Sequence, residues 1–408
     1  MRPLAAHLAL VASALLAAAA ARASNWELDL DLRAVSSDAT ASVLDGGHSP
    51  TRFSEHQSGL QLGRLRFALD TAIGQVWRLH VDASAWGNAY ENPVGLTEAY
   101  LQFRPYPRNN LRVRMKAGAF FAPVSLENGA GGWASPYTLS YSALNSWLAE
   151  EVRTLGLETK VDWLGTRTGL PFDVGAVAGV FGWNEVAGAA LAEGGFILDD
   201  RQTPLFDSVG KLEGPSGTRI EPFRQIDGRA GYYGGMDLQY PGRLLITALR
   251  YDNRADPTAS DAESHVFAWH TTFNSAGARM EYGAGWTLVA QWMQGQTEIA
   301  PGGRPLEWPF NARYVLLSKR FGRRHILSVR YDRFEVDSRN ADADGAQSGH
   351  AWTAAYVFDP GKAWTVTLEW LRVTSSSYSW SESLDSPGPV TDNQAQLSIR
   401  YALGSTLY

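Results

Sequence analysis

Residues 364–370 read WTVTLEW, and this stretch decides the fold because apolar and polar side chains alternate along it. An alternation of period two places Trp364, Leu368 and Trp370 on one face of a β-strand and Glu369 on the other. The two tryptophans are six residues apart, which is roughly 20 Å along a strand. That distance is near the height of the lipid-facing apolar band of a membrane barrel, which aromatic belts border on both sides. The stretch therefore predicts a strand with lipid on one face and water on the other.

The same alternation recurs along the chain and predicts sixteen strands. In residues 26–34, 77–85 and 111–119, one face is again apolar while the opposite face carries charge. Leu62 and Leu65 are out of phase with each other, which predicts a bulge in the second strand. We expect strands near residues 26–35, 59–70, 76–86, 97–105, 111–120, 154–163, 172–182, 230–240, 244–252, 264–274, 285–297, 311–321, 325–336, 350–359, 363–374 and 393–404.

The connections between these strands alternate in length. Those after even-numbered strands are mostly short, such as 241–243, whereas those after odd-numbered strands are mostly long, such as 121–153 and 184–229. Short turns at one end and long loops at the other are typical of transmembrane barrels. Strands with one apolar and one charged face are satisfied when the sheet closes around a wet lumen in lipid. We therefore expect an all-β fold: a closed antiparallel transmembrane β-barrel of about 16 strands, with short periplasmic turns and long extracellular loops.

Residues 1–23 have the pattern of a signal peptide. A positive start at Arg2 precedes a run rich in Ala and Leu, and Ala21-Arg22-Ala23 supplies small residues at the cleavage site. An N-terminal membrane anchor is the alternative, although the run is short and the cleavage site follows it directly. We expect export and cleavage, which leave residues 24–408 as a single outer-membrane barrel domain with a net charge of 34 − 42 = −8.

Composition narrows the classes of function. The 408 residues contain 36 Lys and Arg against 42 Asp and Glu, so the basic surface of a nucleic-acid binder is not expected. The absence of Cys excludes disulfides, thiolate metal sites and a Cys nucleophile. Gly-x-Ser-x-Gly and His-Glu-x-x-His motifs are also absent, and we expect no catalytic site, metal or cofactor. A soluble exported β protein is a further alternative, which membrane fractionation would test.

Basic side chains are expected to line one wall of the lumen. The inward faces of the second, third and fifth strands supply Arg64, Arg66, Arg78, His80, Arg112, Arg114 and Lys116. The connection at 121–153 is too long for a simple hairpin, carries Glu127, Glu150 and Glu151, and is expected to turn helical between Ser142 and Val152. We predict that it folds inward and constricts the pore, with its carboxylates setting a transverse field against the basic wall. The alternative is a loop over the mouth and basic side chains that are only solvated.

The rest of the lumen face is expected to carry both signs of charge. Arg250-Tyr251-Asp252 and Arg330-Tyr331-Asp332 repeat one pattern at the outer ends of two strands. Each is interpreted as a tyrosine in the outer aromatic belt, flanked by an inward ion pair. The acids expected on this face are Glu27, Asp29, Asp31, Asp162, Asp237 and Glu369, and the bases are Lys160, Arg250, Arg313, Arg330, Arg372 and Arg400.

Three stretches resemble the phosphate-selective porin (O/P type) family. Residues 60–86, which include GRLRF at 63–67 and WRLHVD at 77–82, are similar to the first hairpin of that family, and residues 98–105, EAYLQFRP, resemble its next strand. Residues 116–127, from KAGAF to PVSLE, are similar to the strand that leads into its third loop. The resemblance implies a sixteen-stranded, often trimeric outer-membrane channel. Phe121 stands where the family often has Lys, so the resemblance does not extend to phosphate selectivity.

We therefore expect an outer-membrane porin for passive diffusion of small hydrophilic solutes or ions, with anions such as phosphate among the candidates. Its expected partners are outer-membrane lipid and lipopolysaccharide, small polar solutes or ions, and further copies in a homotrimer, but no nucleic acid. The alternative is an outer-membrane barrel with an occluded lumen that acts as a receptor or structural protein. In that case the connection at 184–229 fills the lumen or binds a partner.

Overall fold

The computed structural model describes residues 24–87, 94–339, 346–361, 363–377 and 388–404. These residues form sixteen strands and two α-helices, α2 (Ala143–Glu151) and α3 (Ala189–Gly194). The predicted signal peptide lies outside the described residues. The strands are β1 (Ser24–Ser37), β2 (Gly59–Ile73), β3 (Trp77–Ala85), β4 (Val94–Phe103), β5 (Leu111–Phe120), β6 (Thr154–Trp163), β7 (Asp173–Gly182), β8 (Gly231–Tyr240), β9 (Leu244–Asp252), β10 (His270–Tyr282), β11 (Trp286–Ile299), β12 (Leu306–Phe321), β13 (His325–Val336), β14 (Gln347–Gly361), β15 (Trp364–Ser377) and β16 (Val390–Gly404).

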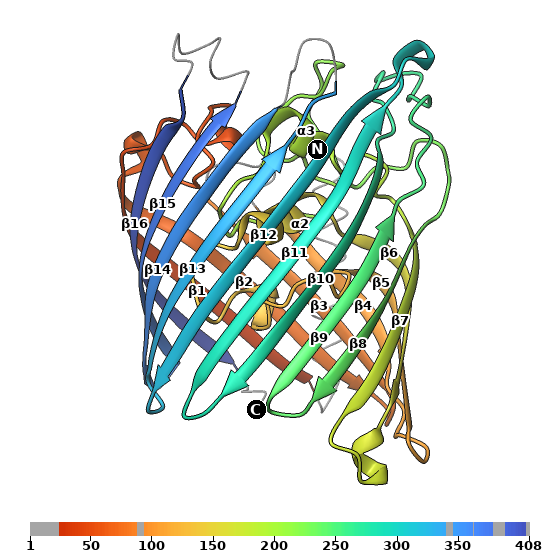
Figure 1. Cartoon of the computed structure of the whole chain (residues 1–408), viewed down its shortest axis with the longest axis vertical. Coiled ribbons are helices and arrows are strands. Elements are labelled where there is room, and N and C mark those ends of the chain that lie inside the picture. The colour runs from red at the N-terminus through yellow and green to blue at the C-terminus, as the bar shows by residue number, and fades with distance from the viewer. Residues whose placement is uncertain (1–23, 88–93, 340–345, 362, 378–387, 405–408) are drawn as a thin grey trace.

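The sixteen strands close into one antiparallel barrel (Figure 1). Each strand pairs with its neighbours in sequence, and β1 also pairs with β16, so that Leu30 faces Tyr401 on one side and Leu65 on the other. Because the first strand joins the last, none of the described strands is left with an open edge, as a lipid environment requires. The predicted fold class is confirmed.

Short turns and long connections alternate as predicted, with one strand misplaced. The expected strand at 264–274 is instead β10, which begins at His270 and runs to a short turn at 283–285. Gly283 and Gly285 both have positive φ in that turn, a conformation that glycine adopts without strain. Val266 and Trp269 are apolar because they are buried in the connection before β10, and their hydrophobicity mimicked the start of a strand.

Apolar side chains cover the outer surface of the barrel. On β15, Trp364, Leu368 and Trp370 remain 44%, 54% and 43% exposed. Near the short turns, the ring of Trp364 packs on that of Tyr401 with centroids 4.5 Å apart. Farther along the wall, toward the long connections, other aromatic rings continue the outer surface. Among the described residues, no helix is long and apolar enough to cross a membrane.

The predicted bulge in β2 is present at Gly63. Asp31 faces Arg64 but the next residue, Leu32, faces Leu62, so Gly63 has no partner in β1. A Cβ at Gly63 would lie 2.5 Å from Nε of Arg33, which a larger residue could not tolerate without displacing that side chain. The extra residue restores the phase in which Arg64 is buried inside the barrel while its neighbours alternate outward.

The interior differs from the expected water-filled lumen, because much of it holds a hydrophobic cluster. The connections β1–β2, β5–β6 and β7–β8 contribute Leu44, Trp147 and Leu198 to this cluster. The inward faces of the strands around them are apolar as well, as Phe273 of β10 and Phe310 of β12 illustrate with exposures of 1% and 2%. The chain therefore has an apolar surface inside the barrel in addition to the one facing lipid.

Around this cluster, the polarity of the two faces of the wall is reversed. Tyr251 is expected in the outer belt, but its ring is buried inside between Phe181 and Phe273, at centroid distances of 5.0 and 4.8 Å. The prediction of an inward Arg250 is also wrong, since its side chain is exposed on the outer face. Inner connections supply the apolar surface on which these strands pack, which turns polar residues outward.

The same reversal places Arg313 and Arg372 on the outer face, where the sequence interpretation put them in the lumen. By contrast, the second repeat of the Arg-Tyr-Asp pattern behaves as predicted. Arg330 is buried inside the barrel. Tyr331 lies outside, where its ring packs on Trp352 with centroids 4.8 Å apart.

Replacing Leu368 by Arg should destabilise the barrel by about 2–4 kcal/mol, because Leu368 lies between the two tryptophans of the lipid face, where a cation loses its hydration. Unfolding by urea in lipid vesicles measures this change. Thr365→Arg, on the opposite face of β15 and in contact with an internal cavity, is the matched control and should cost much less. Equal losses in both variants would contradict the assignment of the two faces.

Candidate functional site

The connection 121–153 enters the barrel. Helix α2 contacts β12 and β13, and Figure 1 shows it inside the ring of strands. The carbonyl of Val124 accepts a hydrogen bond from Gln291 of β11 at 2.8 Å. The carbonyl of Gly132 accepts one from Arg64 of β2 at 2.9 Å. The connection thus reaches from one wall of the barrel to another.

Arg330 of β13 anchors this connection and is fully buried. Its guanidinium donates to Glu127 at 2.5 Å, to the carbonyl of Ser140 at 2.7 Å and to the carbonyl of Tyr141 at 2.8 Å. Its Nε donates to Asp332 of the same strand at 2.8 Å. A buried charge is tolerated only with such a full set of partners. The packing of the connection and the burial of this cation therefore depend on each other.

Glu369 of β15 provides a second anchor. Its carboxylate accepts from the backbone N–H groups of Leu139 and Ser140 at 2.6 and 3.0 Å. Asp332 likewise accepts from the N–H of Ala143, at 3.2 Å. These wall carboxylates were expected to face water, but they accept hydrogen bonds from the backbone just before α2 and from its first residue instead.

Helix α2 lies within the residues predicted to turn helical. The Ser142 hydroxyl caps its first turn by accepting from the N–H of Asn145. Trp147 packs against Phe273 and Phe310, with ring centroids 5.5 and 5.0 Å away. The helix is therefore held by apolar contact with β10 and β12 as well as by the polar anchors at its start.

Glu151, at the end of α2, joins this helix to the β7–β8 connection. Its carboxylate accepts from the Trp147 indole at 2.7 Å and from the N–H groups of Gly188, Ala190 and Leu191 at 3.1, 2.8 and 3.0 Å. Burial raises the pKa of Glu151 to about 7, and these hydrogen bonds oppose that rise. The Glu151 carboxylate therefore links α2 to the β7–β8 connection by hydrogen bonds.

The connection at 184–229 also enters the barrel. The alternative of an occluded lumen predicts this position if the connection fills the lumen. Asp200 bridges Arg33 of β1 at 2.5 Å and Arg52 of the β1–β2 connection at 2.7 Å. Burial opposes ionisation of Asp200, but the two guanidinium groups hold its pKa well below the ordinary value. The Leu198 N–H donates to the carbonyl of Pro50 at 2.7 Å. Three inner connections are thereby packed as one unit.

A group of cations lies on the inner wall of β5 and β6, and we call Arg112, Arg114, Lys116 and Lys160 the inner basic patch. Asp162 accepts from Arg112 at 2.9 Å and from Arg114 at 2.8 Å. The two arginine side chains are 29% and 30% exposed, whereas that of Asp162 is 5% exposed. The cations therefore lie over their counter-ion and present their charge to the lumen.

The lysines of the inner basic patch repeat this arrangement. Lys160 lies 2.5 Å from Asp237 of β8, with side-chain exposures of 23% and 11%. Lys116 lies 3.4 Å from Glu158, with exposures of 22% and 7%. In every pair the cation is the more exposed partner. The patch is thus positive toward the lumen even though carboxylates lie beneath it.

The other predicted wall residues lie inside the barrel but in different surroundings. Arg66 is 3% exposed and is paired with Asp82 at 2.6 Å and Asp29 at 3.1 Å. A Cβ at Gly132, whose φ is positive, would lie 2.4 Å from Nε of Arg66, so the connection approaches closely only because this residue is glycine. Arg64 donates to Gly132, as described above.

His80 and Arg78 lie closer to the short turns. The His80 ring is 3.1 Å from Asp70 and 4.8 Å, between centroids, from Tyr100. Arg78 is exposed and borders a cavity of about 390 Å³ beside the β2–β3 and β4–β5 turns.

The three carboxylates of the predicted constriction do not face the inner basic patch. Glu127, Glu150 and Glu151 are 0%, 2% and 0% exposed. Glu127 pairs with Arg330, while Glu150 accepts from the hydroxyl of Thr203. These carboxylates hold the inner connections together, so they are not placed to set up the expected transverse field against the basic wall.

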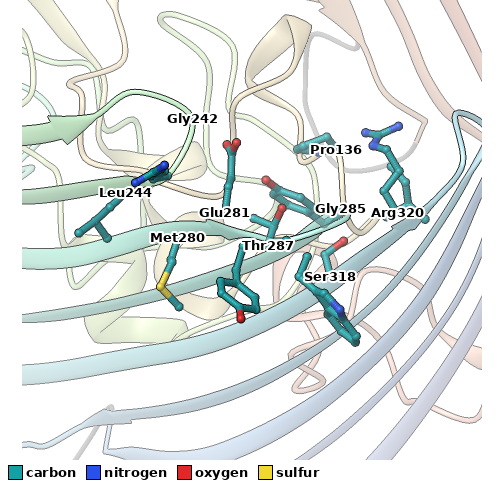
Figure 2. A pocket seen from close by; sticks show the side chains of 15 residues that line it. Pro136, Gly242, Leu244, Met280, Glu281, Gly285, Thr287, Ser318 and Arg320 are labelled. Atoms are coloured by element: carbon teal, nitrogen blue, oxygen red, sulfur yellow. The ribbon is translucent and has the colours of Figure 1, made fainter. Parts of the chain in front are cut away.

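Open space within the barrel is found toward the short turns. A cavity of about 810 Å³ is bordered by Pro136 of the inward connection and by Glu281 and Arg320 of the wall, which Figure 2 shows around one space. A second cavity, of about 220 Å³, separates the connection from β1, β15 and β16. The described residues contain no group of three or more His, Cys, Asp or Glu side chains arranged to hold a metal ion. Cavities of this size, together with the charged side chains of the wall, can select solutes by size and by charge.

Comparison with known proteins gives a match in fold. No protein-family model matches the chain, and no characterised protein matches its sequence. The outer membrane channel DcaP of Acinetobacter baumannii has a TM-score of 0.55 at 11% identity, covering 93% of this chain and 96% of that chain. A trimer form of OmpT, an outer membrane protein of Vibrio cholerae, has 0.53 at 10%, covering 93% and 99%. OmpF of Salmonella typhi, in complex with daunomycin, has 0.51 at 12%, covering 93% and 97%.

The chain therefore has the fold of outer-membrane porins. The narrower resemblance to the phosphate-selective family rests on the three sequence stretches alone. The sequence interpretation omitted Glu158 from the lumen and did not join Lys160 to the basic residues of β5. Glu158, Lys160 and Asp162 share one parity, so the period of two contained that information. The anchoring role of Arg330 had no comparable signal, because its partners come from a distant part of the chain.

Replacing Arg330 by Ala should loosen the connection 121–153, since Glu127, Asp332 and Glu369 would be buried without their shared cation. Removing one partner from a buried ion pair costs about 3–5 kcal/mol. We expect limited proteolysis in detergent to cut this connection at least tenfold faster than in the wild type. Arg333→Ala, three residues along on the outer face of β13, is the matched control and should cleave at the wild-type rate. Identical cleavage of both variants would contradict the anchor.

Replacing Glu151 by Gln should loosen the contact between α2 and the β7–β8 connection. An amide can accept through only one of its two terminal atoms, so N–H groups among Gly188, Ala190 and Leu191 would lose their acceptor, at about 1–3 kcal/mol each. Hydrogen exchange at these amides should accelerate at least fivefold. The exposed Glu213→Gln in the same connection is the control. If these amides exchange at the same rate in the Glu151 variant as in the wild type, the hydrogen bonds of Glu151 are not needed to hold the two segments together.

Proposed function

We propose that this protein is an outer-membrane porin through which small hydrophilic solutes diffuse passively, with a preference for anions. The observation that carries the proposal is the inner basic patch, in which each cation is at least twice as exposed as the carboxylate beneath it. In physiological salt, charges are screened beyond about 8 Å. A passing ion therefore responds mainly to the outermost charges, which here are positive.

The inner connections set the size limit of the proposed channel. Residues 121–153 and 184–229 pack against β10 to β15. They also reach β1, β2 and β4, through the ion pair of Asp200 with Arg33 and the hydrogen bonds from Arg64 to Gly132 and from the Leu205 N–H to the carbonyl of Leu96. The path we infer follows the wall formed by β3 to β6, past Arg114 and Lys116, and opens into the cavity at the short turns. A charged constriction of this kind selects by pore width and by electrostatic barrier.

The same proposal includes the cellular setting. Residues 1–23 act as a cleaved signal peptide, and the mature chain is inserted in the outer membrane with its short turns in the periplasm. Lipid and lipopolysaccharide surround it, and three copies associate. The protein works as a channel and not as an enzyme, without a metal or cofactor.

An occluded barrel is the second candidate, and a specific observation favours it. The hydrophobic cluster joins three inner connections to the walls of β7 to β15, which is more packing than a single constricting loop needs. A barrel filled in this way would serve as a receptor or structural protein. Planar bilayer recordings separate the two candidates: stepwise conductance supports the channel, and its absence supports the occluded barrel.

Replacing Arg114 and Lys116 together by Glu should shift the reversal potential in a KCl gradient toward the cation potential, because the variant would add carboxylates beside Asp162 and Glu158. We expect the chloride-to-potassium permeability ratio to fall several-fold. Arg313→Glu with Arg333→Glu makes the same charge change on the outer face and is the matched control. A reversal potential equal to that of the wild type would exclude the inner basic patch from the ion path. Replacing chloride by phosphate then measures the order of anion preference.

A further inference from the structure

A second group of basic side chains lies on the outer surface of the barrel, on four neighbouring strands. We call Arg313 of β12, Arg333 of β13, His350 of β14 and Arg372 of β15 the outer basic patch. Arg313 faces Arg333 directly across the strands, and Arg333 faces His350. Arg372 faces Trp352, the next outward residue after His350 on β14. All four basic side chains are exposed.

The outer basic patch has a defined height on the wall. On each strand, the patch residue lies two positions from an apolar or aromatic residue of the same face. The patch residue is always the one nearer the long connections. The apolar and aromatic neighbours are Val315, Tyr331, Trp352 and Trp370. Two residues correspond to roughly 7 Å along a strand. Aromatic belts of membrane barrels lie at the level of the lipid headgroups. The patch is therefore placed where the charged part of the outer leaflet begins.

The charge of the outer basic patch is not balanced by the chain. In the described residues, none of its three arginines has an ion-pair partner. The nearest carboxylate along the same face is Glu335, which faces Asn311 and Ser348 in the neighbouring strands. Like charges directly opposite each other destabilise a sheet. Arg66, Arg114 and Arg330 inside the barrel each have carboxylate partners, whereas the three arginines of the outer basic patch have none among the described residues and can accept an external anion.

We propose that the outer basic patch binds the phosphate groups of lipopolysaccharide in the outer leaflet. Guanidinium groups bind phosphate through paired, charge-assisted hydrogen bonds, and facing residues such as Arg313 and Arg333 have Cβ atoms about 5 Å apart, close enough to share one phosphate. The adjoining rings of Tyr331 and Trp352 offer contact to acyl chains. The surface is open rather than enclosed, so a free phosphate ion would gain too little from it to compete. The inference rests on the proposed outer-membrane location.

The test is lipid binding by the full-length mature protein in detergent, with native mass spectrometry as the readout. The probes are bisphosphorylated lipid A, the same lipid without phosphates, and inorganic phosphate. The variant replaces Arg313, Arg333 and Arg372 by Gln. The matched control replaces Arg243, Arg323 and Arg324 by Gln, which removes the same charge from the short turns at the opposite end. Heat-dependent mobility on gels verifies folding, and the pair Arg313→Gln with Arg333→Gln serves if the triple variant does not fold.

We expect the triple variant to bind bisphosphorylated lipid A at least tenfold more weakly than the wild type and the control. The wild type should lose a similar factor with the phosphate-free lipid. Equal affinity of variant and wild type, or equal binding of both lipids, would overturn the proposal. Displacement of the lipid by equimolar inorganic phosphate would also overturn it, in favour of a free-anion site. Conductance in phosphatidylcholine bilayers, recorded on the same samples, tests the porin function separately, since lipid A is absent there.

Discussion

The pairing of β1 with β16 is the constraint on which the remaining structure depends. In a bilayer each backbone N–H and C=O needs a partner inside the protein, and a sheet meets that need only by closing on itself. Closure fixes which residues face lipid and encloses a space of limited width. Every long connection must then either lie over the mouth or enter that space, and three of them enter it. The chemistry inside the barrel follows from how these segments are held.

Two kinds of charge arrangement coexist inside the closed wall. Arg330 and Glu369 are buried and hydrogen-bonded to the backbone of the connection 121–153. They therefore fix the position of this connection and contribute little to the electric field that a solute would meet. Arg114 and Lys116 are paired but remain partly exposed, so in the proposed channel they are the cations that a solute meets. The distinction depends on burial and not on residue type. This difference in burial separates the side of the barrel where the inner connections are packed from the side that carries the proposed solute path.

The sequence was sufficient for the lipid-facing half of the fold and insufficient for the interior. A period of two tells which residues share a face, but it does not tell whether that face points inward. Trp364, Leu368 and Trp370 face lipid, whereas Leu371 and Val373, which come directly after Trp370, are buried inside. After Trp370, the apolar residues move from the outward-facing positions to the inward-facing positions of β15. This switch is visible in the sequence, and it marks the end of the lipid-facing band that is nearer the long connections. The pairing of Glu127 with Arg330, 203 positions away, could not be read from any local pattern.

The reversed polarity near the long connections has a consequence for assembly. Trp147 can bury its ring only after β10 and β12 have both paired with β11, and Asp31 meets Ser398 across 367 positions of sequence. Contacts between such distant positions form late, because the chain must lose much of its conformational freedom first. Until then, the nascent polypeptide carries two sets of sticky surfaces, one destined for the bilayer and one for its own centre. A holding chaperone that shields both would be needed for as long as the ring stays open.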